Sequence, residues 1–294
     1  LDWLLLQQAL AAGCECESAV AVRRAAVDET NGLRRVTGVI VGANGGERTI
    51  SARVTIAADG RHSTIAFGLG LASHPRRPRR WAVGAYFEGV TPHRASLRSA
   101  PASEPATLGE MHVRRNRYVG VAPVPGGLTN VCLVRPSGPA DPDLADPEAL
   151  LTRALARDSM LRDRFADARL VAPPVVLGPL AVDVPRAAID GLLLAGDAAG
   201  FIDPMTGDGL RFAVQGGELA ALAALGALEH GWPGVHARLL ADRHRAFAGK
   251  WRFNRALRAL VSSPRTIDAA AFAARLVPSV LRAVIARAGD CDAV

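Results

Sequence analysis

The pattern of apolar and polar positions first divides the chain into a helix and a small sheet. Apolar residues recur at helical spacing over residues 1–12, which predicts an amphipathic helix that ends at Gly13. Beyond it, apolar and polar residues alternate around two turn sequences, Asn31-Gly32 and Asn44-Gly45-Gly46. This alternation predicts a small antiparallel meander over residues 19–51, with a tight turn at each corner.

Two short, continuously apolar runs, residues 54–58 and 192–195, interrupt this alternation. Such runs are typical of strands that are buried on both faces in a parallel sheet. The first run ends at Asp59-Gly60, and the second leads directly into Gly196-Asp197. Because ligands of open α/β sheets bind beyond the carboxyl ends of the strands, the two Asp–Gly pairs mark a candidate binding edge.

The remaining segments predict a second sheet and several helices. Mainly antiparallel strand signals and helical patterns alternate, the strands at residues 81–88, 111–113, 118–123 and 129–134 and the helices at 146–165, 209–229, 235–262 and 268–288. A parallel strand pair with helices, beside an antiparallel sheet, predicts an α/β (α+β) fold class.

Composition narrows the class of protein. The chain has 294 residues, of which 49% are hydrophobic and 21% charged, so it is long enough for a sizeable core and is not a collagen, a coiled coil or a disordered protein. Its cysteines are too few for a disulfide scaffold, and their spacing is no zinc pattern. We therefore expect no metal, a reducing cytoplasmic location and incidental thiols at Cys14 and Cys16 (at a strand start), Cys132 and Cys291.

The net charge of +7 comes from arginines scattered along the chain, and Lys250 is the only lysine. We expect no nucleic-acid partner, because no nucleic-acid-binding motif occurs and aromatic residues make up only 5%. No uncharged apolar run reaches the roughly 18 residues of a membrane helix. Residues 238–258 form a basic amphipathic stretch, which can contact an anionic membrane peripherally or cap a substrate domain; both alternatives stay open.

The motifs at the two strand ends give the sequence a family resemblance. Residues 55–63, TIAADGRHS, resemble the DG motif of flavin-dependent monooxygenases and their relatives. Residues 196–210, GDAAGFIDPMTGDGL, resemble the GD motif of the same superfamily, which has the p-hydroxybenzoate hydroxylase-like fold. In this fuller form, and with residues 118–131 similar to a substrate-domain strand pair, the sequence most resembles the geranylgeranyl reductase branch. The resemblance covers about residues 1–230.

The resemblance implies FAD as cofactor, NAD(P)H as reductant and a small organic substrate. It divides the chain into an incomplete, discontinuous Rossmann-like FAD/NAD(P)-binding domain (1–73 and 171–231), an antiparallel-sheet substrate domain (74–170) and a C-terminal helical region (232–294). It assigns cofactor binding to Asp59, Gly60, Ser63, Gly196, Asp197, Ala198, Ala199, Pro204, Gly207, Asp208, Gly209 and Leu210.

The chemistry of these residues agrees with a flavin site. At a strand end, the Asp197 carboxylate can accept hydrogen bonds from the hydroxyls of a dinucleotide. The loop 207–209 opens a long helix, whose free N–H groups and partial positive charge would stabilise a negatively charged reduced flavin. By resemblance, Pro204 lies beside the flavin ring and Asp59 near the pyrophosphate. Arg61 either reaches a phosphate or is an exposed surface arginine.

The resemblance implies NAD(P)H-driven monooxygenation, that is hydroxylation, of a small organic or secondary-metabolite substrate. The alternative is reduction of prenyl double bonds, as in geranylgeranyl reductases. Halogenation is disfavoured, because the Trp-x-Trp-x-Ile-Pro signature of flavin halogenases is absent. No catalytic acid or base stands out, since His62, His112 and His244 are candidates by residue type alone.

The superfamily's pyrophosphate-binding turn is not found in this sequence. No G-x-G-x-x-G occurs before Asp59. The resemblance therefore implies an N-terminally truncated fold, with the ring-side half of the FAD site present, the phosphate-side half missing and one sheet edge left free. A third hypothesis follows, in which the chain is a non-catalytic fragment that cannot hold FAD alone.

Overall fold

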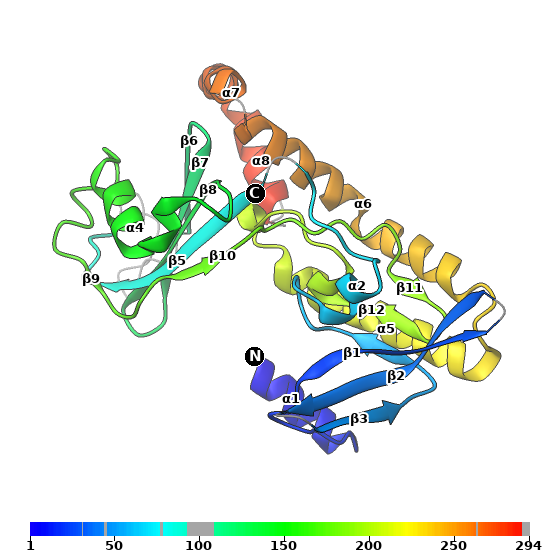
Figure 1. The fold of residues 1–294 in the computed structure, drawn as a ribbon. Coiled ribbons are helices and arrows are strands. Elements are labelled where there is room, and N and C mark those ends of the chain that lie inside the picture. The colour runs from blue at the N-terminus through cyan, green and yellow to red at the C-terminus, as the bar shows by residue number, and fades with distance from the viewer. Residues whose placement is uncertain (31, 44–45, 77–78, 93–108, 263, 290–294) are drawn as a thin grey trace.

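The computed structural model describes residues 1–30, 32–43, 46–76, 79–92, 109–262 and 264–289. The strands form three sheets, and a long helix, α6 (Val235–Ser262), runs from the region of α5 and β11 towards the last two helices (Figure 1). The turn residues Asn31, Asn44 and Gly45 and the thiol of Cys291 lie outside the described residues.

The N-terminal part is a helix followed by the expected antiparallel meander. The elements are α1 (Asp2–Ala11), β1 (Val22–Thr30), β2 (Leu33–Ala43) and β3 (Gly46–Ser51), and the strands pair in the order β1-β2-β3. Cys14 and Cys16 precede β1 without regular structure, so the prediction that they begin a strand is wrong. The chain reaches the sheet only at Val22, where pairing with Val41 starts.

The two apolar runs form neighbouring parallel strands. A three-stranded sheet has the order β11-β12-β4, from β11 (Ala188–Ile189), β12 (Leu192–Leu194) and β4 (Thr55–Ala57). The three leucines of β12 are fully buried, as predicted for a strand covered on both faces. In β4, however, Ile56 is 42% exposed, so the same prediction is wrong for this edge strand.

The second sheet is six-stranded and antiparallel, as its sequence signals predict. It follows the order β10-β5-β8-β7-β6 with β9 on β5, and consists of β5 (Arg80–Glu88), β6 (Glu110–Arg114), β7 (Arg117–Val124), β8 (Leu128–Pro136), β9 (Arg169–Leu170) and β10 (Val175–Leu177). The short helix η1 (Pro142–Ala145) and then α4 (Pro147–Ala156) follow β8, and apolar side chains of α4 pack on the sheet. Helix α4 ends nine residues before the predicted end at 165. Asp158, just beyond it, accepts a hydrogen bond from the Met160 N–H and pairs with Arg114 of β6, which holds the chain in a turn.

Five further α-helices complete the described part of the fold. They are α2 (Thr64–Gly68), α5 (Gly209–His230), α6 (Val235–Ser262), α7 (Pro264–Leu276) and α8 (Pro278–Gly289). Small residues of α5, such as Ala220 and Ala224, let it lie against β12, and Leu239 of α6 joins the same core. A single helix over 268–288 is not found, because Pro278 lacks an N–H donor and disfavours helix at the residue before it.

Candidate functional site

The two sequence motifs begin at the same edge of the three-stranded β11-β12-β4 sheet, which we call the central sheet. Strands β4 and β12 run parallel, with Ala57 opposite Leu194, and the Ala195 N–H donates to the Ala57 carbonyl at 2.9 Å. Asp59-Gly60 and Gly196-Asp197 therefore begin within two residues of a shared backbone hydrogen bond. The structure brings the two motifs together as the sequence predicts (Figure 1).

The loop after β4 turns at Gly60, whose φ of +78° is a left-handed conformation that favours glycine. Asp59, the residue before Gly60, is exposed. Ser63 is buried, and its Oγ accepts a hydrogen bond from the Ala66 N–H at 2.9 Å, so it caps α2. A contact between Ser63 and a cofactor remains a prediction.

The loop after β12 begins with the short helix η2 (Gly196–Ala199). Within it, Ala198 and Ala199 are buried and Asp197 is half-buried. Burial raises the pKa of the Asp197 carboxyl, and the nearby Arg61 guanidinium offsets part of that rise. Arg61 is itself half-buried beside Asp197, so of its two alternatives the exposed surface arginine is wrong.

The next turn, η3 (Pro204–Thr206), is held by a carboxylate that sequence reasoning missed. Asp203 accepts hydrogen bonds from the Met205 N–H at 3.1 Å and from the Tyr118 hydroxyl at 2.5 Å. Its other oxygen lies 3.6 Å from Nη1 of Arg80, and all three side chains are at least 95% buried. Its position directly before a proline was the available signal, because aspartate often caps such a turn.

The loop that opens α5 contains the remaining predicted residues. Gly207 has a φ of +70°, and Asp208 immediately precedes the helix. Asp208 is buried, and it is held by Thr206, by Asn254 and by Lys250, whose Nζ lies 3.1 Å from Oδ1. Burial alone would raise the pKa of the Asp208 carboxyl, but these hydrogen bonds bring it below its ordinary value.

Helix α6 contacts both loops of this site, which the sequence did not predict. Arg243 donates to the Ala199 carbonyl at 2.9 Å, and Asn254 donates to Asp208 at 3.0 Å. Arg243 and Lys250, two of the charges that make residues 238–258 basic, are therefore buried against the motifs. These contacts depend on how α6 packs, so no local sequence signal could have found them.

The residues present fit the ring-side half of FAD. The space beside the α-carbons of Gly60, Gly207 and Gly209 is open, so the backbone of both loops can approach a bulky flat ligand. The first N–H groups of α5, a helix of 22 residues, have no partner within the helix, so they can donate to a developing negative charge at this end. Asp197 adds a carboxylate acceptor for hydroxyl groups.

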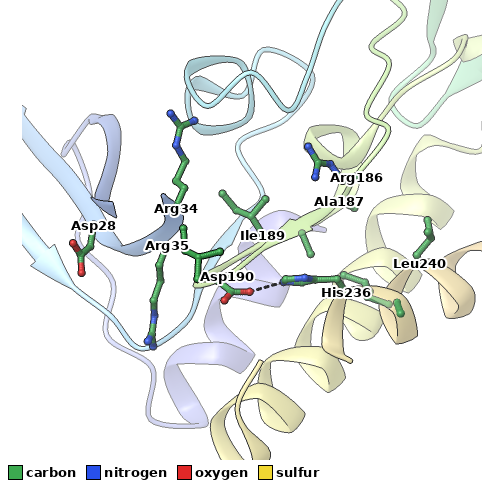
Figure 2. Close-up of a pocket in the computed structure, with 13 residues that line it drawn as sticks. Asp28, Arg34, Arg35, Arg186, Ala187, Ile189, Asp190, His236 and Leu240 are labelled. Atoms are coloured by element: carbon green, nitrogen blue, oxygen red, sulfur yellow. Dashed lines mark ion pairs between the residues drawn. The ribbon is translucent and has the colours of Figure 1, made fainter. Parts of the chain in front are cut away.

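Other features of the described residues lie away from this site. A pocket of about 670 Å³ opens between β2, β11 and α6, where Asp190 and His236 lie 3.2 Å apart and Arg34 and Arg35 point to opposite sides (Figure 2). Its basic groups do not converge on one point. Across the described ranges, no group of three metal-ligating side chains occurs, and no single helix is long and apolar enough to cross a membrane.

Comparison with known proteins agrees with this geometry. Residues 1–247 match the family described as FAD binding domain. The chain is 32% identical over 229 residues to digeranylgeranylglycerophospholipid reductase 2 of Methanopyrus kandleri, which covers 77% of this chain and 54% of that protein. The chain thus spans about half the length of this curated relative.

Solved structures show the same fold. A variant of a flavin-dependent brominase matches with a TM-score of 0.77 at 18% identity, over 99% of this chain and 70% of the other. An anhydrotetracycline hydroxylase from Streptomyces rimosus matches with a TM-score of 0.66 at 22% identity, over 97% and 55%. The chain belongs to the FAD-binding-domain family and, within the FAD-dependent oxidoreductase superfamily, to the geranylgeranyl reductase-like branch.

Proposed function

We propose that the protein containing this chain is an FAD-dependent oxidoreductase that takes electrons from NAD(P)H and delivers them to an organic substrate. The observation that carries this proposal is that Asp59-Gly60 and Gly196-Asp197 follow two paired parallel strands at one sheet edge, next to the start of α5. Bound FAD would supply the electron and hydride transfer. The chain's own residues would bind it, orient it and exclude water.

Each element of the site would have a separate task. Asp197 would accept hydrogen bonds from hydroxyls of the cofactor, and the start of α5 would favour negative charge at the nearby ring edge. Pro204, held by the buried Asp203, would define one side of the ring pocket. No side chain is assigned the role of catalytic acid or base.

The first candidate reaction is reduction of a prenyl-type double bond. The curated relative at 32% identity is named a digeranylgeranylglycerophospholipid reductase, whereas the hydroxylase and the brominase share only the fold. Monooxygenation, the reaction expected from the sequence, is the second candidate and is favoured by those structural similarities. Both reactions use the same cofactor site and differ in whether oxygen is a substrate.

Spectroscopy tests the cofactor proposal. The purified chain, with and without added FAD, is expected to retain a yellow flavin absorption after gel filtration. A folded chain that stays colourless with added FAD would contradict FAD binding by these residues. NAD(P)H oxidation and product formation, measured with and without oxygen, then separate the two reactions: turnover that persists without oxygen excludes monooxygenation.

We also propose that α7 and α8 contact an anionic membrane surface. Several large apolar residues in these helices and at the break between them are 37–66% exposed: Phe272, Leu276, Val277, Val280, Leu281, Val284 and Ile285. Beside them, α7 and α8 carry four arginines and one aspartate, Arg265, Arg275, Arg282, Arg287 and Asp268. The two helices bend by 116° at the break between them. Exposed apolar side chains together with an excess of arginines match the chemistry of an anionic bilayer, which is also where a prenyl lipid would be found.

Vesicle binding tests this membrane proposal. The chain is expected to sediment with vesicles of phosphatidylglycerol and to stay in solution with vesicles of phosphatidylcholine. Ile285→Glu should abolish sedimentation, whereas Leu33→Glu, in the 76% exposed Leu33 of β2, should leave it unchanged. Equal sedimentation of the Ile285→Glu variant would contradict the proposal, as would a stable dimer that covers this surface in sedimentation velocity. Cytoplasmic location remains a prediction.

A further inference from the structure

The only lysine of the chain is buried at the junction of three elements. Lys250 lies on α6, and its residue is 3% exposed. Its Nζ lies 3.1 Å from Oδ1 of Asp208, before α5, and donates to the carbonyls of Arg287 and Ala288 at 2.8 and 3.0 Å. An ammonium has three N–H donors, so these three acceptors satisfy it fully.

Without a partner of opposite charge, the Asp208 carboxylate would be energetically unfavourable at its position. It is buried, and it stands at the start of α5, although its side chain makes no capping bond to the helix. The helix end attracts this negative charge, but the charge in turn cancels part of the positive potential that the helix end would offer to a ligand. A buried charge without a partner is also strongly destabilising. Lys250 supplies the compensating charge from a different helix.

The other two contacts of Lys250 are with carbonyl oxygens at the C-terminal end of a helix, where the partial charge is negative. Arg287 and Ala288 lie in the last turn of α8, where carbonyls have no partner within the helix and carry partial negative charge. An ammonium group is therefore stabilised there as well. One side chain thus joins the C-terminal end of α8 to the loop that opens α5.

We propose that Lys250 is a positioning residue for the candidate flavin loop: it cancels the charge of Asp208, so that the start of α5 stays positive toward the ring, and it ties that loop to α8. The part of this inference that concerns the flavin rests on the proposed function. The contact itself does not, so two separate measurements distinguish the two.

The first measurement needs no cofactor. Since Lys250 is the only side-chain amine, an amine-reactive reagent followed by peptide mass spectrometry reports on it alone, with the N-terminal amine as an internal standard. Lys250 is expected to react at least about tenfold more slowly in the folded chain than in urea, because it reacts only through local opening. Asp208→Asn should accelerate its reaction in the folded chain. Equal rates for Lys250 with and without urea in the unchanged chain would overturn the inference.

The second measurement is the midpoint potential of bound FAD in the protein that contains this chain. Lys250→Met leaves Asp208 unpaired, so we expect a roughly tenfold loss in the preference for reduced over oxidised FAD, equal to a fall of about 30 mV for a two-electron couple. Lys250→Arg keeps the positive charge, so the midpoint potential should fall less in this variant. The double variant Asp208→Asn/Lys250→Met removes both charges and should recover the original potential.

The double variant separates charge cancellation from a purely structural role. If Lys250 served only packing, the double variant would be as impaired as Lys250→Met, and that result would overturn the inference. A chain that protects Lys250 from the reagent but binds no FAD in any variant would contradict the proposed function, while the contact between Lys250 and Asp208 would stand.

Discussion

The Tyr118 hydroxyl donates a hydrogen bond to the Asp203 carboxylate across 2.5 Å and so joins β7 of the six-stranded sheet to the loop after Gly196-Asp197. Arg80, from the neighbouring part of the same sheet, lies on the other carboxylate oxygen. The turn that contains Pro204 is therefore fixed from the antiparallel sheet as well as from its own strand. A change in that sheet can move the candidate flavin loop without touching it directly.

Replacing Tyr118 by phenylalanine tests this connection. The variant leaves the ring in the core but removes one donor from the buried Asp203, so we expect a loss of about 1–2 kcal/mol in the free energy of unfolding. Urea denaturation followed by circular dichroism measures it. Tyr86→Phe is the matched control, because Tyr86 is 46% exposed and should change stability little. Equal effects of the two variants would contradict a specific role for the Tyr118 hydroxyl.

Asp197→Ala tests the central residue of the second motif. Asp197 is half-buried next to Arg61 at the end of β12, where the site offers its carboxylate acceptor. We expect the variant to lose FAD retention in any form of the protein that binds FAD, which flavin absorbance after gel filtration measures. Asp190→Ala, at the remote pocket, provides a control for a lost surface carboxylate. Unchanged flavin occupancy in Asp197→Ala would refute the assignment of this residue.

The sequence predicted the parts of the site that are encoded locally. An apolar run followed by Asp59-Gly60 or Gly196-Asp197 determines both the strand and the turn, because buried strands and glycine turns need particular residues within a few positions. The parallel pairing of β4 and β12 then follows from the family's arrangement. Even Ser63 was identifiable as a helix cap from its own neighbourhood.

The parts that the sequence did not predict depend on distant packing. Lys250 reads as one more basic residue of an amphipathic helix until α6 is placed against the Asp208 loop, 42 residues earlier in the chain. Asp203 likewise needs Tyr118, from another sheet, before its burial makes sense. The break before Pro278, in contrast, does not depend on distant packing. The proline itself signals it, although the apolar periodicity continues across it.

The thiol of Cys132 is expected to be unreactive in the folded protein. Burial, and to a lesser extent the nearby Asp203 carboxylate, raise the pKa of Cys132 to about 11. At pH 8 almost none of it is the reactive thiolate, whereas Cys14 and Cys16 are exposed to the reagent. Iodoacetamide labelling with peptide mass spectrometry should modify Cys14 and Cys16 first, and Cys132 only after urea is added. Labelling of Cys132 at the same rate as Cys14 without urea would contradict this expectation.

The ion pair between Arg114 and Asp158 predicts a defined pH dependence of stability. Burial alone would raise the pKa of the Asp158 carboxyl, but hydrogen bonds from Arg114 and the Met160 N–H bring it below its ordinary value of 3.8. A lowered pKa stabilises the folded state above pH 3.8, and this contribution is lost as the pH falls through the folded value. Asp158→Asn should therefore cost about 2 kcal/mol at pH 7.

Urea midpoints from pH 7 to pH 3 measure this dependence. The difference between the unchanged chain and Asp158→Asn should stay constant near neutral pH and close below pH 3.8. Asp163→Asn is the control, because the pair of Asp163 with Arg162 is exposed and should contribute almost nothing. A difference between the unchanged chain and Asp158→Asn that widens on acidification would show the opposite sign of linkage.

Gly191 lies where the meander meets the central sheet. Its φ is +81°, and a β-carbon added there would lie 1.7 Å from the carbonyl oxygen of Val36 in β2. The backbone of β2 would have to move, because a carbonyl oxygen cannot rotate away as a flexible side chain can. Since Val36 also donates its N–H to the Asp190 carbonyl at 2.8 Å, that movement would break the link between the two sheets.

We therefore expect Gly191→Ala to lower the free energy of unfolding by about 3 kcal/mol or more, through strain at a left-handed residue and overpacking against β2. Gly226→Ala in α5 is the matched control, because the space beside the Gly226 α-carbon is open and alanine favours helix, so stability should rise by roughly 0.5–1 kcal/mol. Thermal and urea denaturation of both variants measure the contrast. If Gly191→Ala is tolerated as well as Gly226→Ala, β2 does not pack on the β11–β12 turn as closely as the structure shows.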